Sequence, residues 1–186
     1  KIGFNSNNVY IGSTSGAGEI HFKNNISSND APNSSGDTKM IIADSAVIIN
    51  NGVTLGNGTT YAAANTLDDY EEGTWTPTGT NFTVNNVYNA RYTKIGNQVT
   101  VNGYITGTGG GGGNANIQGL PFTVISSGYS VGNVDITNSN ANLPDKAIRC
   151  QPNSTYFIFQ KNNDVNVSGS EIDGGHIIFT LTYFTT

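Results

Sequence analysis

The first sixty residues contain only short apolar segments. Strand-like runs at residues 1–4, 9–11, 40–42 and 46–49 are separated by turns rich in Asn, Ser and Gly. Segments this short bury too little apolar area to offset the conformational entropy that is lost when their residues become ordered. This part of the chain therefore needs a shared core, either among its own repeats or with other copies of the chain.

Two architectures provide such a core. Repeated units stack along one chain in a solenoid, or several chains wind together so that each strand faces its copies across an axis. The segments here recur at irregular spacings, whereas a solenoid is built on a fixed period. We therefore predict that residues 1–64 form the shaft of an intertwined homotrimer, with a solenoid as the alternative.

The amino-acid composition indicates the fold class and argues against some kinds of partner. Only 11% of the residues are charged, compared with about 25% in an ordinary soluble domain. Thr, Val, Ile, Tyr and Phe are plentiful, which favours strands and predicts an all-β fold. A net charge of −5 with only 8 Lys and Arg argues against a nucleic-acid partner. No apolar run approaches the ~20 residues that cross a membrane, so membrane insertion is not expected.

The chain changes character at residues 66–77, which contain Trp75, the only tryptophan. This stretch also has the densest cluster of charge, formed by Asp68, Asp69, Glu71 and Glu72. Thr66 is a suitable helix N-cap and Gly73 a suitable stop, so the pattern predicts one helical turn followed by a strand that begins at residue 74. Residues 65–77 are accordingly predicted to be a junction.

Longer strands follow in residues 78–186. Residues 92–95 and 98–105 flank a Gly-Asn pair, and the second run alternates apolar with polar residues, which predicts a β-hairpin. Five consecutive glycines at 109–113 predict a loop, because glycine loses the most backbone entropy in regular structure. About eight short strands with turns between them predict a β-sandwich or jelly-roll head.

Several motifs resemble one known family. They are Asn65-Thr-Leu-Asp-Asp-Tyr-Glu-Glu-Gly-Thr-Trp-Thr-Pro77, Tyr92-Thr-Lys-Ile-Gly-Asn97 with Val99 and Val101 after it, and Gly119-Leu-Pro-Phe122. In this order they resemble the C-terminal region of bacteriophage tail fibre and tailspike proteins. The motifs cover residues 65–122, and the last strand matches more loosely.

The resemblance implies a role at the surface of a virus particle. It implies a homotrimer with a β-sandwich head at the distal tip of a tail fibre, joined to upstream tail fibre or baseplate proteins. The head would bind a glycan or a protein receptor on the host cell surface. Many such fibres carry a self-cleaving chaperone domain at the C-terminus, and nothing in this sequence resembles one.

Polar loops of the head are the best candidates for receptor contacts. Asn, Asp, Ser and Tyr side chains suit sugar hydroxyls and sugar rings, and they are frequent at residues 107–116, 138–145 and 161–175. Three copies in a trimer would strengthen weak single contacts through avidity. The candidate receptor-binding residues are Tyr104, Tyr129, Asn138, Asn140, Asn142, Asp145, Asn162, Asn163 and Asp164.

Catalysis is not expected, and no catalytic residue or cofactor is predicted. Paired carboxylates would serve a glycosidase, but the acidic residues at 68–72 lie in one local segment where solvated capping explains them. The glycine run lacks the Lys-Ser/Thr of a phosphate-binding loop. A polysaccharide-degrading tailspike and a purely structural virion component remain the alternatives.

Two histidines, His21 and His176, are the only ones in the chain. In a trimer, a histidine at the axis occurs three times and would be able to bind a metal ion or an anion. Neither histidine belongs to a multi-ligand spacing, and both lie in strand-like runs. A position on a strand face is therefore favoured, and no metal site is predicted.

Overall fold

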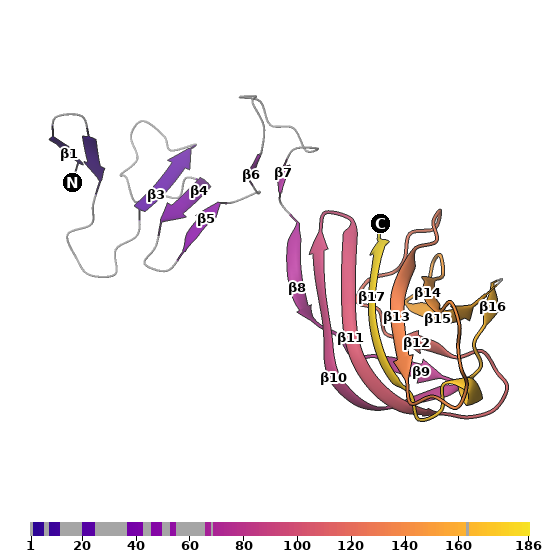
Figure 1. Ribbon diagram of the computed structural model, residues 1–186. Helices are drawn as coiled ribbons and strands as arrows, with labels where there is room; N and C mark the ends of the chain where they lie inside the picture. The colour runs from indigo at the N-terminus through magenta and orange to yellow at the C-terminus, as the bar shows by residue number, and fades with distance from the viewer. Residues whose placement is uncertain are drawn as a thin grey trace. The chain divides into compact units, whose positions relative to one another are not determined.

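The computed structural model describes residues 2–5, 8–11, 20–24 and 37–42, then 46–49, 53–54, 66–67 and 69–186 except 163. The chain divides into two compact units, Lys1–Asp68 and Asp69–Thr186. Strands account for most of the described residues in both units (Figure 1). The prediction of an all-β fold is therefore confirmed.

Short antiparallel sheets make up the described part of the first unit. Strand β1 (Ile2–Asn5) pairs with β2 (Asn8–Ile11), and β6 (Val53–Thr54) pairs with β7 (Thr66–Leu67). A third, three-stranded sheet has β4 (Asp37–Ile42) in the middle, flanked by β3 (Ile20–Asn24) and β5 (Val47–Ile49).

Large apolar side chains stay exposed in this unit. They are Val47, Ile48, Ile49, Val53 and Leu67. This agrees with the expectation that short segments do not bury their apolar groups unaided. Whether copies of the chain cover them remains a prediction.

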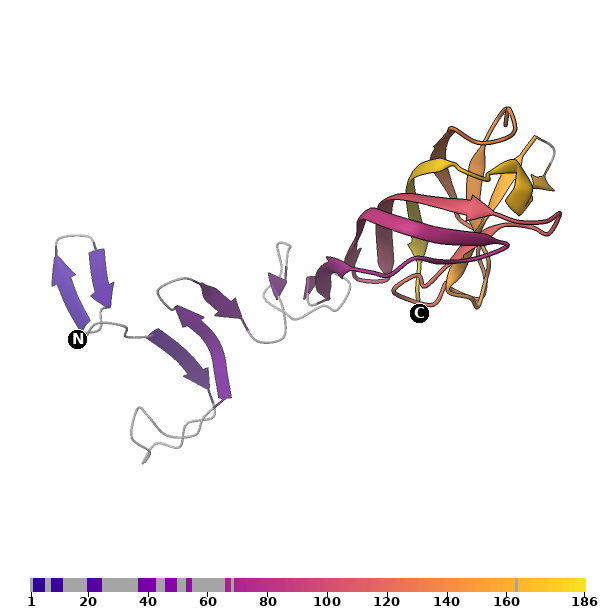
Figure 2. The same cartoon turned by 90° about the horizontal axis from the view of Figure 1, so that it is seen from below.

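The second unit is a single ten-stranded antiparallel sheet with the strand order β8-β10-β11-β17-β13-β14-β15-β12-β9, and β16 pairs with β15. The strands are β8 (Tyr70–Thr74), β9 (Thr78–Thr80), β10 (Phe82–Ile95), β11 (Gln98–Gly109), β12 (Asn116–Gln118), β13 (Val131–Thr137), β14 (Ala147–Cys150), β15 (Tyr156–Lys161), β16 (Val165–Asn166) and β17 (His176–Phe184). A 3-10 helix, η2 (Gly169–Glu171), precedes β17. Figures 1 and 2 show how the sheet curls.

The curled sheet encloses one hydrophobic core. Strand β17 alternates strictly, and its Ile177, Phe179, Leu181 and Tyr183 are buried. The ring centroid of Phe179 lies 5.1 Å from that of Phe157 on β15. Because β13 and β14 separate these two strands along the sheet, the contact crosses the interior. The two halves of the sheet therefore pack against each other.

The predicted hairpin is confirmed as β10–β11, the longest pairing in the sheet. Ile95 pairs with Gln98 across a two-residue turn, and Gly96 adopts a φ of 57° there. A positive φ at the first central residue is what such hairpin turns require, and glycine meets it without steric cost.

The predicted helical turn at residues 66–73 is wrong. Thr66–Leu67 is strand β7, and Tyr70–Thr74 is β8, which pairs along β10 from Ile95 to Arg91. Hydrogen bonding to the neighbouring strand outweighs a weak capping signal, and Tyr and Thr favour strands. The strand expected from residue 74 is also wrong in position, because residues 75–77 are irregular and β9 begins at Thr78.

Candidate functional site

The outer face of the sheet, defined as the solvent-facing side of β10, β11 and β17, is mostly uncharged. Thr100, Asn102, Tyr104 and Thr106 project from β11, in alternation with buried residues. They lie across from Thr182, Thr180, Ile178 and His176 of β17, in that order. Period-2 alternation places every second residue of a strand on the same side. The face is therefore a regular array of hydroxyl, amide and aromatic groups.

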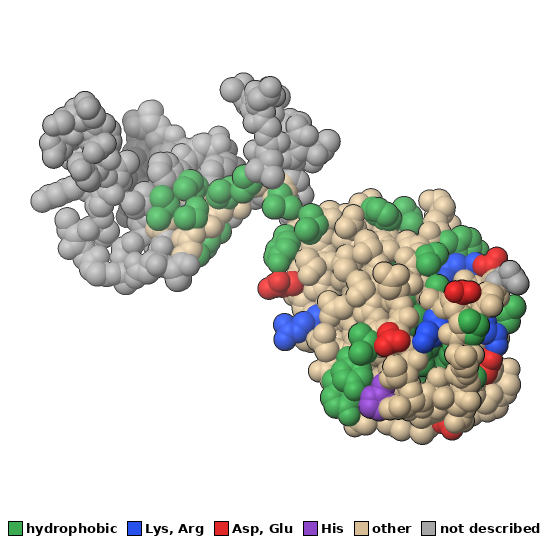
Figure 3. Space-filling model, in the orientation of Figure 1, with side chains coloured by type: hydrophobic (Ala, Val, Ile, Leu, Met, Phe, Trp, Pro, Cys, Tyr) green, Lys and Arg blue, Asp and Glu red, His purple; other side chains and the backbone are tan. Residues whose placement is uncertain are grey.

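Three rings form an aromatic platform at one end of this face, consisting of Tyr88, Tyr104 and His176. The rings of Tyr88 and Tyr104 stack with their centroids 4.5 Å apart and their planes 21° apart. The Tyr104 hydroxyl forms a hydrogen bond of 2.8 Å with His176 Nδ1. Figure 3 shows a hydrophobic patch beside the purple histidine side chain. His176 thus fixes Tyr104, and Tyr104 supports the exposed ring of Tyr88.

A β-bulge explains why Tyr88 reaches this position. The register of β10 against β11 shifts between Val87 and Asn89, which pair with the consecutive residues Ile105 and Tyr104. Tyr88 is therefore an extra residue without a direct partner. A second shift lies between Val84 and Asn86. Bulges of this kind re-aim side chains and occur often beside functional sites.

Amide side chains lie beside the platform. The Asn89 amide donates a hydrogen bond of 2.9 Å to Asn102 Oδ1, and the Asn86 amide donates one of 3.1 Å to Thr106 Oγ1. Each asparagine has two donor hydrogens and two acceptor lone pairs. A single bond therefore leaves hydrogen-bonding capacity at the surface. A shallow groove of about 310 Å³ begins at Asn102 and continues towards β8.

The three loops that were predicted to carry receptor contacts meet beside this end of the sheet. Asp173 joins them, because its carboxylate accepts hydrogen bonds from the Gly109 backbone at 2.9 Å and from the Asn140 amide at 3.3 Å. The Gly169 backbone also donates to the Gly113 carbonyl at 3.0 Å. The loops therefore form one connected cluster.

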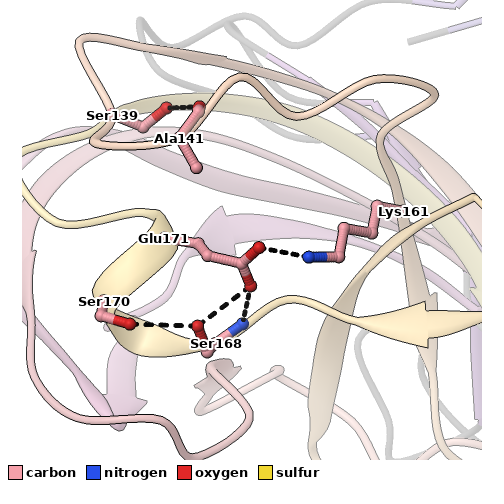
Figure 4. Close-up of polar contacts among 6 residues, drawn as sticks. All are labelled: Ser139, Ala141, Lys161, Ser168, Ser170 and Glu171. Carbon is pink, nitrogen blue, oxygen red and sulfur yellow. Dashed lines mark hydrogen bonds and ion pairs between the residues drawn. The ribbon is translucent and has the colours of Figure 1, made fainter.

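Glu171 fixes the geometry of this loop cluster (Figure 4). Its carboxylate pairs with Lys161 and accepts hydrogen bonds from the backbone and the hydroxyl of Ser168 at 2.9 and 3.0 Å. The bond to Lys161, followed by the Ser168 backbone bond, lowers the pKa of the Glu171 carboxyl. The Ala141 backbone donates to the Glu171 carbonyl at 3.2 Å. These partners give Glu171 a structural role.

The predicted receptor residues are only partly brought together. Tyr104 belongs to the platform, and Asn138 and Asn140 lie in the adjoining loop. Tyr129 and Asp164 instead gather around Arg149, whose guanidinium carbon lies 5.0 Å from the Tyr129 ring centroid and whose Nη1 lies 3.8 Å from Asp164 Oδ1. Asn142, Asp145 and Asn162 are exposed loop residues. Asn163 lies outside the described residues.

Backbone conformation accounts for three of these candidates. Asn138, Asp145 and Asp164 have φ values of 56°, 48° and 60°. Asn and Asp tolerate this left-handed region better than other residues with a side chain. Their identities are therefore explained by turn geometry, without any contact to a ligand.

The acidic cluster is engaged in contacts within the sheet. Asp69 pairs with the buried Lys94, Glu71 accepts a hydrogen bond from the Tyr92 hydroxyl, and Glu72 accepts one from Tyr70 at 2.8 Å. Hydrogen bonding to these carboxylates raises the pKa of both tyrosines. Glu71 and Glu72 are consecutive in β8 and so project to opposite sides. Asp68 lies outside the described residues.

Metal ligands are not grouped in the described part of the chain. No set of three or more His, Cys, Asp or Glu side chains is arranged there to hold an ion. His176 is hydrogen-bonded to Tyr104. His21 lies in β3, and its side chain is outside what the structure describes. Among the described residues, no helix has the length and hydropathy to span a membrane.

Sequence reasoning missed Tyr88 and the role of His176. A signal was present, because residues 85–89 (Asn-Asn-Val-Tyr-Asn) interrupt the alternation of a long strand. Such an interruption indicates a bulge. The stacking on Tyr104 across the hairpin depends on register, which only the structure establishes.

Comparisons of the chain with protein-family models, with curated proteins and with solved structures gave no match. The resemblance to tail fibres therefore rests on the sequence motifs alone. The outer face, with its platform and loop cluster, is the main guide to function.

Proposed function

We propose that this chain is the distal part of a bacteriophage tail fibre, a non-enzymatic virion component that attaches the particle to the host. In this proposal the second unit is a β-sandwich-like head that binds a glycan or an outer-membrane receptor. The observation that carries the proposal is the aromatic platform. The exposed ring of Tyr88, held on the half-buried Tyr104 beside asparagine amides with spare hydrogen-bonding capacity, suits recognition at a surface.

A trimeric shaft is the second part of the proposal. Val47, Ile48 and Ile49 are consecutive in the edge strand β5, and all three are exposed. Because alternate residues face opposite sides of a strand, both faces of β5 are apolar. Two further copies of the chain would cover such faces, as in an intertwined fibre whose upstream partners are tail fibre or baseplate proteins.

A polysaccharide-degrading spike has less support. Asp69, Glu71 and Glu72 each already have a protein partner, and the last two project to opposite sides of β8. A glycosidase needs two carboxyl groups that flank one glycosidic bond. We therefore favour attachment without cleavage.

The proposal is tested with the full chain, labelled with a fluorophore, on a panel of bacterial strains. We expect saturable binding to at least one strain, competition by its purified capsule, lipopolysaccharide or outer-membrane protein, and no release of reducing sugar. Light scattering should give three times the chain mass of 19.5 kDa. A monomer that binds no strain would overturn the proposal, and sugar release would replace it with the depolymerase.

A further inference from the structure

The aromatic platform presents one ring to solvent. Tyr88 is 61% exposed, although one face of its ring stacks on Tyr104. An exposed tyrosine normally loses rotamer entropy when a ligand orders it. Here the stacking and the bond from Tyr104 to His176 already restrict the ring. The free face of Tyr88 is therefore a preorganised apolar surface.

The surroundings of this ring are mostly polar. Asn89 and Ile178 are the cross-strand neighbours of Tyr104, and Thr106 lies across from His176. Asp135, which pairs with Ile178, is within 3.6 Å of Lys146. A ligand at the platform therefore meets mainly amide and hydroxyl groups, and Arg91, the cross-strand partner of Asn102, adds one positive charge beside them.

We propose that the aromatic platform and Asn89 form a subsite for an uncharged pyranose ring of a glycan. The apolar C–H face of the sugar stacks on the free face of Tyr88, while its hydroxyls bond the amide groups of Asn89 and Asn102. This inference rests on the proposed attachment function and specifies its ligand class. Tyr104 and His176 are positioning residues, because they act by holding Tyr88.

The same face is a poor match for contact with a second copy of the chain. A stable interface buries roughly 800 Å² on each partner and has an apolar centre. Around the platform, Asn86 and Asn89 are exposed, and Asn102 and Thr106 are half-buried. Val87 and Ile178 are the exposed apolar residues there, which is a small apolar area for such an interface. Amide-rich surroundings that leave polar groups unpaired favour a hydroxyl-rich ligand.

The test is saturation-transfer NMR on the full chain with the methyl glycosides of glucose, galactose, mannose and N-acetylglucosamine as probes. Methyl glucuronide is the charged comparison. We expect transfer to at least one neutral sugar, strongest on its C–H ring protons. Tyr88→Ala should weaken the affinity for that sugar about fivefold to tenfold. Tyr88→Phe should retain binding because it keeps the ring.

A matched control is Tyr70→Ala, because Tyr70 is 57% exposed and lies on β8, away from the platform. This variant should bind the sugar as the unchanged protein does. Equal binding by Tyr88→Ala, binding of the glucuronide alone, or no transfer to any neutral sugar would overturn the inference. A lower mass for Tyr88→Ala would show that the platform is an interface between copies, which would also overturn it.

Failure of this inference is distinguishable from failure of the attachment proposal. If Tyr88→Ala still binds host cells as the unchanged chain does, the platform is not the sugar subsite and attachment stands. If the unchanged chain binds a neutral methyl glycoside but no cell of the panel, the subsite stands and the attachment proposal fails.

Discussion

Two apolar runs in this chain have opposite environments. In β5 of the first unit, Val47, Ile48 and Ile49 are 57%, 46% and 41% exposed. In β15 of the second unit, Phe157, Ile158 and Phe159 are 0%, 8% and 0% exposed. Both runs consist of three consecutive large apolar residues in a strand. Local apolar content is therefore not what separates them.

The difference comes from the strands available as neighbours. Strand β15 lies inside a continuous sheet that curls over its own core, and Phe157 contacts Phe179 on the opposite half. Strand β5 is the edge of a three-stranded sheet. A strand is buried on both faces only where other parts of the protein pack on both faces, and a three-stranded sheet cannot provide these contacts. We therefore expect the second unit to be stable by itself, and the association of the first unit with other copies stays a prediction.

The largest effect is expected from Phe159→Ala in the second unit. Phe159 is fully buried, so its removal should lower the free energy of unfolding of this unit by about 3–5 kcal/mol. Chemical denaturation followed by tryptophan fluorescence measures the change, because Trp75 lies in the same core. Val165→Ala, at an exposed position of the neighbouring β16, is the control and should change it by less than about 0.5 kcal/mol. An equal effect of both variants would contradict the assigned core.

A smaller effect is expected at the start of the second unit. Lys94 is buried, pairs with Asp69, and lies 5.5 Å from the Phe122 ring centroid. Asp69→Ala would leave this charge without its carboxylate partner and should cost about 1–3 kcal/mol of unfolding free energy. Lys94→Met keeps the packing and removes the charge, so it should cost less. The reverse order, measured by the same denaturation, would show that the ion pair does not anchor β8.

The next smaller effect is expected from Tyr183→Phe, which should lower the free energy of unfolding by about 1–2 kcal/mol. The buried Tyr183 hydroxyl donates to the Phe122 carbonyl at 3.1 Å and accepts from the Phe122 backbone N–H at 3.3 Å. Burial raises the pKa of Tyr183 above its usual value. The unfolded chain therefore loses this proton first, near pH 10, and stability should fall as the pH rises further. Denaturation midpoints from pH 8 to 11 should fall less steeply in Tyr183→Phe, and an unchanged slope would contradict this role.

The sequence predicted those parts of the fold that depend on local patterns. The alternation at residues 98–105 corresponds to β11, because a half-buried strand shows its two sides directly in its sequence. The three polar loops were located only approximately, because residues 107–109 belong to β11 and residues 161–175 contain β16 and η2. Their assembly around Asp173 was not evident from the local patterns.

Non-local pairing limited the rest of the prediction. The acidic residues of β8 resemble the first turn of a helix, and only the edge of β10 makes this segment a strand. The contact of Arg149 with Tyr129 and Asp164 likewise joins separate segments. For the candidate site, Tyr104 was among the predicted receptor-binding residues, but Tyr88 depends on a bulge and a register that the local pattern does not determine.

Ile48→Ser should have the smallest effect on the second unit and the clearest effect on association. Ile48 lies in the first unit and makes no contribution to the core around Phe159, so the denaturation transition of residues 69–186 should not move by more than about 0.5 kcal/mol. If copies of the chain cover β5, a hydroxyl at this position weakens the apolar contact, and light scattering should show a lower mass at the same protein concentration. Thr54→Ser, in strand β6 of a separate two-stranded sheet, is a mild control that should leave the mass unchanged. An unchanged mass for Ile48→Ser would mean that β5 is not covered by sister chains. A shifted unfolding transition of the second unit would mean that its stability depends on Ile48, which would contradict a second unit that is stable by itself.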